Sequence, residues 1–367
     1  MKNFVIFLLF LTSCTHIKKL EVEGVKKKNS SFSIAWIKNH DPLYDTGNLP
    51  IALNSPLIYK DMVFSGSAAG QFNAYDLETG RTLWSEGDGG EFRSTPLGYK
   101  ENIIYGNGQG RVFSRNALTG KLNYVVDLDE SVEGQGVHYK GRLFFHTRNH
   151  KLFCLDIETG RILWAYKRSI SFLTTMQRAS TPLVHEGRVY VGFADGFVAA
   201  FNVEDGAMLW ESRTSEGAKF VDVDSRPIFW NGKLVVPSNL GKLAFLSPQT
   251  GQVIRRIQHA SYRSPLVLNN GNLLFGTVNG KILEIDRNLT VIQEVKVANF
   301  SISNIQVWKE GHLVSGMGRE LLLLDKKFAL VSKFDLGHQF SSVFGVIDVN
   351  EQYAAVLSSR NRLYLFR

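Results

Sequence analysis

Two histidines four residues apart, His146 and His150, are the first side chains in the sequence whose types and spacing could do chemistry. On one face of a helix, this spacing can bring two imidazoles together as zinc ligands. Here the two residues flank a short turn between two expected strands, where a spacing of four carries no such geometry. We therefore expect no metal ion at this pair.

Other catalytic patterns are equally weak. The glycine-rich segment GNGQGR at residues 106–111 is similar to a phosphate-binding loop, but its position predicts a hairpin turn. The sequence contains no Gly-x-Ser-x-Gly elbow and no paired carboxylates in an evident cleft. We therefore expect no catalytic residues, no cofactor and no enzymatic activity.

Length and composition are compatible with one large β-rich fold. The chain has 367 residues, 44% of them hydrophobic, with 33 glycines and only 9 prolines. Many glycines with few prolines suit a succession of hairpins, and closed all-β folds often remain single domains at this length. The formal net charge is +8, but no basic-aromatic strip accompanies it, so a nucleic-acid partner is not expected.

The first residues have the pattern of an export signal. Lys2 provides a positive start, and residues 4–11 form an apolar run too short to span a bilayer. The run ends in Leu-Thr-Ser-Cys14, which resembles the bacterial lipobox. That resemblance implies a signal peptide at residues 1–13 and acylation of Cys14, which gives firm anchoring because more than one acyl chain is attached. The alternative is an ordinary signal peptide in which the cysteine occurs by chance.

Residues 14–30 are then expected to form a lipidated tether ahead of a folded domain at residues 31–367. The lysines of the tether are interpreted as solvated charges, with contact to a membrane surface as the alternative. Thr15, rather than Asp, follows the cysteine, which favours the outer membrane over the inner membrane. If Cys14 carries lipid, Cys154 has no partner for a disulfide.

A four-strand pattern recurs along the rest of the chain. In residues 180–210, turns in which glycine follows an acidic residue separate three short runs rich in β-branched and aromatic residues, and a fourth run ends at Trp210. Glycine supplies the positive φ that tight hairpins need. The arrangement predicts a four-stranded antiparallel meander.

The end of the meander carries a more specific motif. It consists of a small residue, Asp or Asn two positions on, then Thr-Gly or Asp-Gly, and an aromatic residue four positions after the glycine. The copies are AYDLETGRTLW at 74–84, CLDIETGRILW at 154–164, AFNVEDGAMLW at 200–210 and the weaker SRNALTGKLNY at 114–124. We expect the Asp or Asn to bond across the turn to the Thr hydroxyl or the backbone. The aromatic ring would lie flat against a neighbouring sheet, where the small residue leaves room for it, so Cys154 is interpreted as buried packing rather than a nucleophile.

This motif resembles the tryptophan-docking motif of PQQ-type β-propellers. The residue that opens the third strand recurs at intervals of 39 to 46, at Gly70, Gly110, His150, Gly196, Gly241, Gly280, Arg319 and Asn361. The resemblance implies an all-β fold, an eight-bladed β-propeller with four antiparallel strands in each blade. The motif decays after its fourth copy, because Arg255 and Glu294 stand where the next aromatic residues would be.

The closure of the ring can also be predicted. The last strand-like run, residues 363–366, is the third strand of the eighth copy and lacks an outer neighbour. Residues 31–36, SFSIAW, have the composition and the terminal Trp of an outer strand. We therefore expect this N-terminal strand to complete blade eight, which leaves no open sheet edge.

Two connections between blades are longer than the others. The distance from the docking aromatic to the next first strand is 12 residues after Trp84 and after Tyr124, but 18 after Trp164 and 17 after Trp210. Both long connections flank the fourth blade, so they are expected side by side on one face. Extra loop length on a rigid scaffold often serves binding, although neutral drift in loop length is the alternative.

A lipoprotein with a single eight-bladed propeller of this type resembles the BamB family, scaffold subunits of the outer-membrane β-barrel assembly machinery. The family contacts the periplasmic POTRA domains of BamA through these two connections. Residues 220–227, FVDVDSRP, match the second family loop closely, which implies partner contacts by Asp222 and Asp224. In an extended segment these two carboxylates would point the same way. In the first connection, Thr174, Met176 and Gln177 occupy the Leu, Leu and Arg positions of the family, with Arg178 one residue late.

The resemblance implies a non-enzymatic, lipid-anchored scaffold on the periplasmic side of the outer membrane, monomeric within the assembly complex. Two alternatives remain open. One is an enzyme that binds PQQ or another small ligand in the central funnel, although such dehydrogenases are usually longer and have a vicinal cysteine pair that this sequence lacks. The other is a propeller lipoprotein unconnected with barrel assembly.

Overall fold

The computed structural model describes residues 31–40, 51–170, 179–215, 221–238, 242–259, 261, 263–337 and 341–367. These residues all belong to one compact unit, residues 31–367. The expected signal peptide, Cys14 and the tether lie outside the described residues, as does Gly241.

The described chain forms eight four-stranded antiparallel sheets, which we call blades 1 to 8. Blade 1 contains β2 (Leu57–Tyr59), β3 (Met62–Gly66), β4 (Gln71–Asp76) and β5 (Thr82–Gly87); blade 2 contains β6 (Leu97–Tyr99), β7 (Asn102–Gly106), β8 (Arg111–Asn116) and β9 (Leu122–Asp127). Blade 3 contains β10 (Val137–Tyr139), β11 (Arg142–His146), β12 (Lys151–Asp156) and β13 (Ile162–Lys167); blade 4 contains β14 (Leu183–His185), β15 (Arg188–Gly192), β16 (Phe197–Asn202) and β17 (Met208–Arg213).

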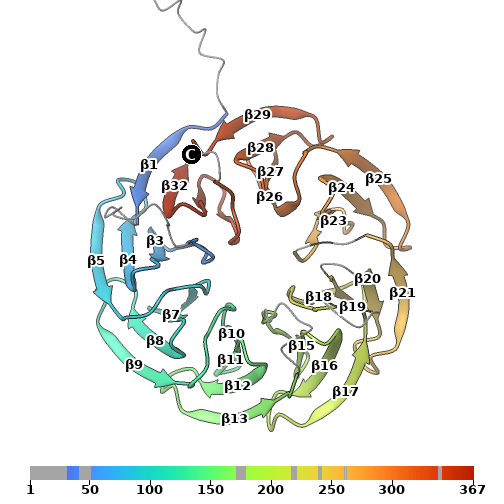
Figure 1. Ribbon diagram of the computed structural model, residues 1–367, viewed down its shortest axis with the longest axis horizontal. Coiled ribbons are helices and arrows are strands. Elements are labelled where there is room, and N and C mark those ends of the chain that lie inside the picture. The colour runs from blue at the N-terminus through green and yellow to red at the C-terminus, as the bar shows by residue number, and fades with distance from the viewer. Residues whose placement is uncertain are drawn as a thin grey trace, which may run out of the picture. The chain divides into compact units, whose positions relative to one another are not determined.

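The second half of the chain repeats this arrangement. Blade 5 contains β18 (Ile228–Trp230), β19 (Lys233–Val236), β20 (Leu243–Leu246) and β21 (Val253–Ile257); blade 6 contains β22 (Leu266–Val267), β23 (Leu273–Gly276), β24 (Lys281–Ile285) and β25 (Val291–Lys296). Blade 7 contains β26 (Ile302–Trp308), β27 (Gly311–Gly316), β28 (Glu320–Leu324) and β29 (Leu330–Asp335); blade 8 contains β30 (Asp348–Val349), β31 (Ala354–Leu357), β32 (Arg362–Phe366) and β1 (Ile34–Asn39). The blades follow one another around a ring (Figure 1), so the expected eight-bladed propeller is confirmed.

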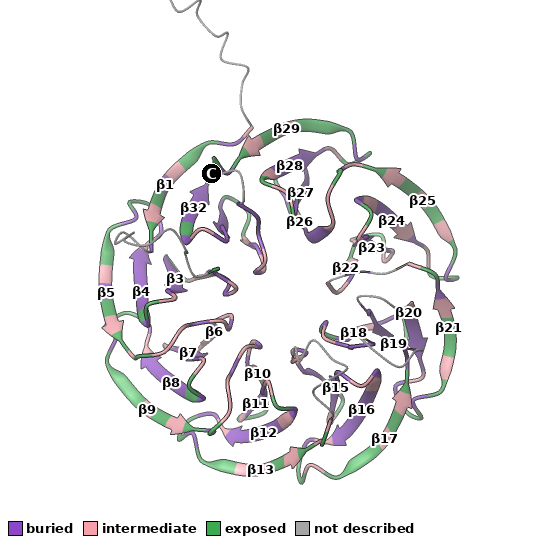
Figure 2. Cartoon of the chain, viewed as in Figure 1, coloured by how far each residue is buried: buried purple, intermediate pink, exposed green. Residues whose placement is uncertain are grey.

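Burial follows the position of a strand within its blade. The second and third strands are buried almost throughout, as in β3 and β16, because neighbouring blades cover both faces of them. The outer strands alternate between exposed and partly buried residues, because one of their faces meets solvent. Figure 2 shows this gradient from buried middle strands to exposed outer strands.

The ring closes through an N-terminal strand, as expected, but this strand is Ile34–Asn39 rather than residues 31–36. β1 pairs antiparallel with β32, with Trp36 opposite Leu365 and Asn39 opposite Arg362. From blade 7, the ammonium group of Lys309 donates hydrogen bonds to the carbonyl oxygens of Ser31 (2.8 Å) and Arg367 (3.1 Å). Blade 8 is therefore completed by residues from both ends of the folded unit, and its third strand has no open edge.

Each docking aromatic donates a hydrogen bond to a backbone carbonyl of the next blade. The acceptor is the residue that follows the Asp or Asn of the motif, or its equivalent in blade 5. The pairs are Trp36 to Leu77 (2.9 Å), Trp84 to Ala117 (2.8 Å), Tyr124 to Ile157 (3.0 Å), Trp164 to Val203 (3.0 Å) and Trp210 to Pro248 (3.1 Å). The expected bond across the turn is also present, from the Thr159 hydroxyl to the Asp156 carboxylate (2.7 Å).

The structure corrects our interpretation of the small residue in the motif. Cys154 lies opposite Trp164 within the same blade, so it makes room for the aromatic residue of its own sheet. In the neighbouring blade, it is the motif glycine that accommodates the ring: a Cβ on Gly120 would lie 2.8 Å from the Trp84 indole. Cys154 is fully buried, and burial raises its pKa to about 11, which agrees with a packing role.

The turns between the third and fourth strands of blades 6 and 7 support this steric explanation. Leu289 in blade 6 and Phe328 in blade 7 hold the positive-φ position with φ of 65° each. The preceding blades carry Arg255 and Glu294 in place of a docking aromatic. Because no aromatic ring packs against these turns, a residue with a side chain fits there. The glycines of the motif are therefore needed both to leave room for the ring and to adopt a positive φ.

We predict that Gly120→Ala costs far more stability than Gly141→Ala. Both glycines have positive φ, 72° and 78°, but nothing lies within 4 Å of a Cβ on Gly141. The backbone alone costs about 1–2 kcal/mol, and overpacking against Trp84 adds about 1–3 kcal/mol. Chemical denaturation measures the free energy of unfolding of the two glycine variants, of Trp84→Ala and of the double variant Trp84→Ala with Gly120→Ala. Equal costs for both glycine variants, or strict additivity with Trp84→Ala, would contradict the role of the ring.

Candidate partner-binding face

One face of the ring is built from two kinds of segment that bond to each other. In blade 1, the backbone N–H of Asp88 donates to the Gly70 carbonyl (3.1 Å), and that of Phe92 donates to the Ser67 carbonyl (3.2 Å). Asp88 and Phe92 belong to the connection that leads into blade 2, whereas Ser67 and Gly70 belong to the turn between β3 and β4. The connections are therefore fastened to the second-to-third-strand turns, and both lie on one face, as expected. We call it the connection face.

The same pair of contacts recurs around the ring. The further pairs are Leu128 to Gly110 and Val132 to Asn107 in blade 2, Thr214 to Gly196 and Val223 to Phe193 in blade 4, Val297 to Gly280 and Ile302 to Thr277 in blade 6, and Leu336 to Arg319 and Val343 to Gly316 in blade 7. In each blade, the acceptor of the first hydrogen bond named is the residue that opens the third strand. Its φ is positive at Gly110 (88°) and also at His150 (59°) and Asn361 (58°), but Arg319 does not adopt this conformation.

Serines ahead of several first strands fix the inner ends of the connections. The Ser94 hydroxyl donates to the Gly106 carbonyl (2.8 Å), and the Ser180 hydroxyl donates to the Gly192 carbonyl (2.9 Å). The Gly192 N–H in turn donates to the Ser180 hydroxyl (2.9 Å). This exchange satisfies polar groups that burial would otherwise leave unpaired. It explains why a serine stands two positions before a proline at residues 94–96 and again at 180–182.

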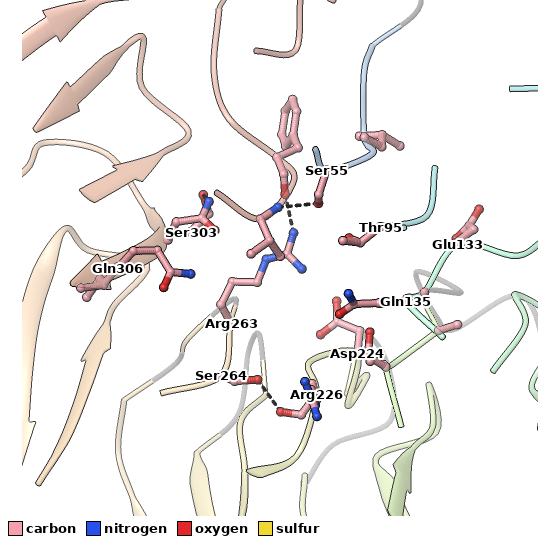
Figure 3. Close-up of a pocket in the computed structure, with 18 of the residues that line it drawn as sticks. Ser55, Thr95, Glu133, Gln135, Asp224, Arg226, Arg263, Ser264, Ser303 and Gln306 are labelled. Atoms are coloured by element: carbon pink, nitrogen blue, oxygen red, sulfur yellow. Dashed lines mark hydrogen bonds between the residues drawn. The ribbon is translucent and has the colours of Figure 1, made fainter. Parts of the chain in front are cut away.

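The inner ends of the connections surround a central cavity of about 450 Å³. Figure 3 shows side chains from successive blades, among them Gln135, Asp224, Arg226 and Arg263, arranged around it. On its wall, Arg93 pairs with Glu91 (2.6 Å) and with Glu133 (3.2 Å). This charged cavity was not expected from the sequence. The available signal was an Arg next to the Ser-Pro or Ser-x-Pro element of successive blades, at Arg226 and Arg263.

The structure places Asp222 and Asp224 in different surroundings. Asp222 is 1% exposed, and its backbone carbonyl accepts a hydrogen bond from the Ser238 hydroxyl (3.4 Å). Asp224 is half-buried and lines the cavity. In the propeller by itself, only the Asp224 carboxylate of this pair is accessible, and contact between a partner and Asp222 stays a prediction. The two-residue alternation fails because residues 221–224 form no strand, and Val223 is fully buried between them.

The other expected partner residues, Thr174, Met176, Gln177 and Arg178, lie outside the described residues. The start of their connection is described and is held firmly. The Arg168 guanidinium pairs with Asp195 (2.7 Å) and Glu211 (2.6 Å) and lies over the rings of Phe193 and Phe197. The long connection between blades 3 and 4 thus leaves β13 from a fixed point on the connection face.

Comparison with known proteins decides the family. The sequence profile of a family described as "Outer membrane protein assembly factor BamB" matches residues 48–133 and 126–327, most of the propeller. The chain belongs to the BamB family. A BamB from Moranella endobia is 24% identical over 248 residues, and the alignment spans 63% of each chain, less than two thirds of that relative.

Two further similarities show which kinds of protein have this type of propeller. The crystal structure of BamB from Moraxella catarrhalis superimposes with a TM-score of 0.77 at 17% identity, covering 92% of this chain and 99% of the other. The quinoprotein alcohol dehydrogenase PedH from Pseudomonas putida is 29% identical over 165 residues, which is 40% of this chain and 27% of that enzyme. The BamB family thus shares its propeller with enzymes, and the fold alone does not separate the two functions.

Among the described residues of this BamB-family chain, no group of three or more His, Cys, Asp and Glu side chains is placed to hold a metal ion. The same residues include no helix long and apolar enough to cross a membrane.

His146 and His150 form a buried pair beneath the connection face. Their ring centroids are 5.7 Å apart, and both rings pack against Phe193 of blade 4. The Ser180 carbonyl lies 3.1 Å from Nδ1 of His146, while Nε2 of His146 and both ring nitrogens of His150 have no hydrogen-bond partner among the described residues. Burial lowers the pKa of His146 to about 3 and that of His150 to about 4.

We predict that this BamB-family propeller loses stability as the pH falls below about 6.5, the ordinary pKa of histidine. Unfolded histidines bind protons in the window from pH 6.5 down to about 4, whereas the buried pair stays neutral there. The free energy of unfolding therefore drops by up to about 1.4 kcal/mol per pH unit for each histidine. In the folded state, Asp195 raises and Arg168 lowers the pKa of His150, so these two charges partly offset each other.

Denaturation curves from pH 7 to 4.5 check this dependence. His150→Asn keeps a residue that tolerates positive φ and should flatten the slope, whereas His138→Asn, at an exposed position on β10, is the control. An unchanged slope in His150→Asn would contradict the assignment to this pair.

Proposed function

We propose that this protein is a non-enzymatic scaffold subunit in the assembly of outer-membrane proteins, and that it binds a protein partner through its connection face. The family match over residues 48–327 carries the proposal, because relatives of that family bear the name of outer membrane protein assembly factors. The partner implied by the resemblance is the set of POTRA domains of BamA.

The construction of the connection face supports a binding role. Its connections are held by backbone hydrogen bonds to the turns and by serine hydroxyls, so a partner would meet a preformed surface rather than order a loose one. Preformed surfaces bind more tightly because less conformational entropy is lost on association. Asp224 is half-buried and lines the central cavity at the inner ends of the connections, so it is the carboxylate of the pair that a Lys or Arg of the partner would meet.

The second candidate function is a PQQ-type or other small-ligand enzyme that uses the central cavity. The similarity to a quinoprotein alcohol dehydrogenase favours it, although that alignment reaches only 27% of the enzyme. Purification of the native protein separates the two: a stoichiometric assembly partner supports the scaffold, and a bound cofactor with its own absorption spectrum supports the enzyme.

We predict that Asp224→Ala weakens binding to purified POTRA domains by about 2 kcal/mol or more, roughly 30-fold in Kd, if the carboxylate becomes buried against a basic side chain. The melting temperature should stay nearly unchanged, because a loop charge contributes little to the core. Calorimetric titration and a thermal melt of each variant test this.

The controls for that experiment come from the same chain. Glu78→Ala removes an exposed carboxylate in the turn after β4, on the opposite face, and should leave binding intact. Asp222→Ala alters a buried residue and should lower the melting temperature. Unchanged binding in Asp224→Ala would remove this residue from the interface, and equal losses in Glu78→Ala would show a nonspecific charge effect.

We further propose that Cys14 is acylated and anchors the protein on the periplasmic side of the outer membrane. The lipobox-like Leu-Thr-Ser-Cys14 supports this, together with the names of the relatives. We predict that Cys14→Ala gives a precursor or a soluble periplasmic protein, whereas the unaltered chain fractionates with the outer membrane. Labelling with a radioactive fatty acid and membrane fractionation check the outcome, and label retained in Cys14→Ala would contradict the site.

A further inference from the structure

The central cavity has two chemically different walls. One wall is charged and polar and comes from the connections into blades 2 to 6, with Arg93, Glu133, Asp224, Arg226 and Arg263. The other wall is uncharged and comes from blades 6 to 8 and the entry to blade 1. Its apolar side chains are Leu53, Leu266, Ile305, Met317, Phe344 and Val346, and its polar ones are Ser55, Ser303, Asn304 and Gln306. The cavity is therefore amphipathic, and its volume of about 450 Å³ lies within the range of small-ligand sites.

The charges on the polar wall do not balance. Three arginines and two carboxylates line the cavity, so three positive charges minus two negative charges leave +1. Glu133 is engaged by Arg93 (3.2 Å) and by Arg148 (3.4 Å), which lies outside the cavity lining. Arg263 donates a hydrogen bond to the Phe344 carbonyl oxygen.

Arg226 is the group that the described chain leaves uncompensated. No carboxylate of the described residues pairs with its guanidinium, although its own backbone carbonyl accepts a bond from the Ser264 hydroxyl. Its side chain is accessible from the cavity, and the surrounding protein removes part of its hydration, which lowers its pKa. A partly desolvated cation without an anion is costly, and the cavity leaves room for that anion.

We propose that the central cavity binds a small organic monoanion with an apolar body, its carboxylate paired with Arg226 and its apolar part against the wall formed around Ile305, Met317 and Phe344. A guanidinium receives a carboxylate through two parallel hydrogen bonds, which orients the ligand. Met317 is 41% exposed and gains burial when the apolar part covers it. The ligand class includes an amino-acid derivative or the free carboxyl end of a peptide.

The two acidic residues of the wall restrict the ligand to a single negative charge. Asp224 precedes Arg226 by two residues and lines the same cavity (Figure 3). A second carboxylate on the ligand would meet Asp224 and Glu133 with only one unit of excess positive charge available. This inference concerns the cavity itself and does not depend on the proposed assembly partner.

The test uses the folded full chain and two matched probes, N-acetyl-L-phenylalanine and its uncharged amide. Calorimetric titration should give binding of the acid with a stoichiometry of one, and binding of the amide at least about tenfold weaker. Arg226→Gln should weaken binding of the acid by about tenfold or more and leave that of the amide unchanged. Arg255→Gln, at an exposed position on the outer strand of the same blade, is the matched control and should bind like the unaltered protein.

Two more variants keep the test decisive if Arg226→Gln does not fold. Met317→Ser, at an exposed position, should weaken binding of the acid without removing its preference over the amide. Asp224→Asn should admit a dicarboxylate probe, benzylsuccinate, that the unaltered protein binds poorly. Equal affinity for acid and amide, an unchanged affinity in both the Arg226 and Met317 variants, or no binding of the acid at millimolar concentration would each overturn the proposal.

Discussion

A hydrogen bond from a ring N–H or hydroxyl to the backbone of the next blade is the contact on which the first half of the propeller depends. It joins blade 8 to blade 1 through Trp36, and the series continues to blade 5 through Trp210. Each ring also occupies the space above a glycine, which fixes both the distance and the rotation between adjacent sheets. Because each blade touches only its neighbours, an error in one contact would change the curvature on which closure depends.

The second half of the ring is joined by other means. Trp230, on the first strand of blade 5, donates to the Gly271 carbonyl of blade 6 (2.8 Å), and Tyr364 of blade 8 donates to Leu336 (3.1 Å). Between the last blade and the first, the Asp348 carboxylate accepts the N–H of Ile58 (2.6 Å). Polar side chains thus reach a backbone group of the neighbouring blade in both halves, although the repeated motif is present in only one. The ring therefore needs a side-chain hydrogen bond between neighbouring blades, and different residue types can supply it.

The connection face follows from the same construction. Because the outer strand of one blade must return to the inner strand of the next, every connection crosses the turn between the second and third strands, and it bonds to that turn on the way. The inner ends of the connections then converge on the axis, where side chains from all the blades meet around one cavity. A scaffold fastened in this way can vary the length and charge of its connections without disturbing the sheets.

The sequence alone determined the features that arise within one repeat. Strand length, hairpin glycines and the docking motif predicted eight blades, an N-terminal closing strand and the buried Cys154, because local patterns decide which residues pair within a sheet. The closing strand itself is Ile34–Asn39 rather than residues 31–36. The tertiary structure decided what depends on several blades at once. It buried Asp222 while Asp224 stayed accessible, it assigned the docking glycine to the ring of the preceding blade, and it gathered Arg93, Arg226 and Arg263 around one cavity. These residues are tens of positions apart in the chain, and only the curvature of the closed ring brings them together.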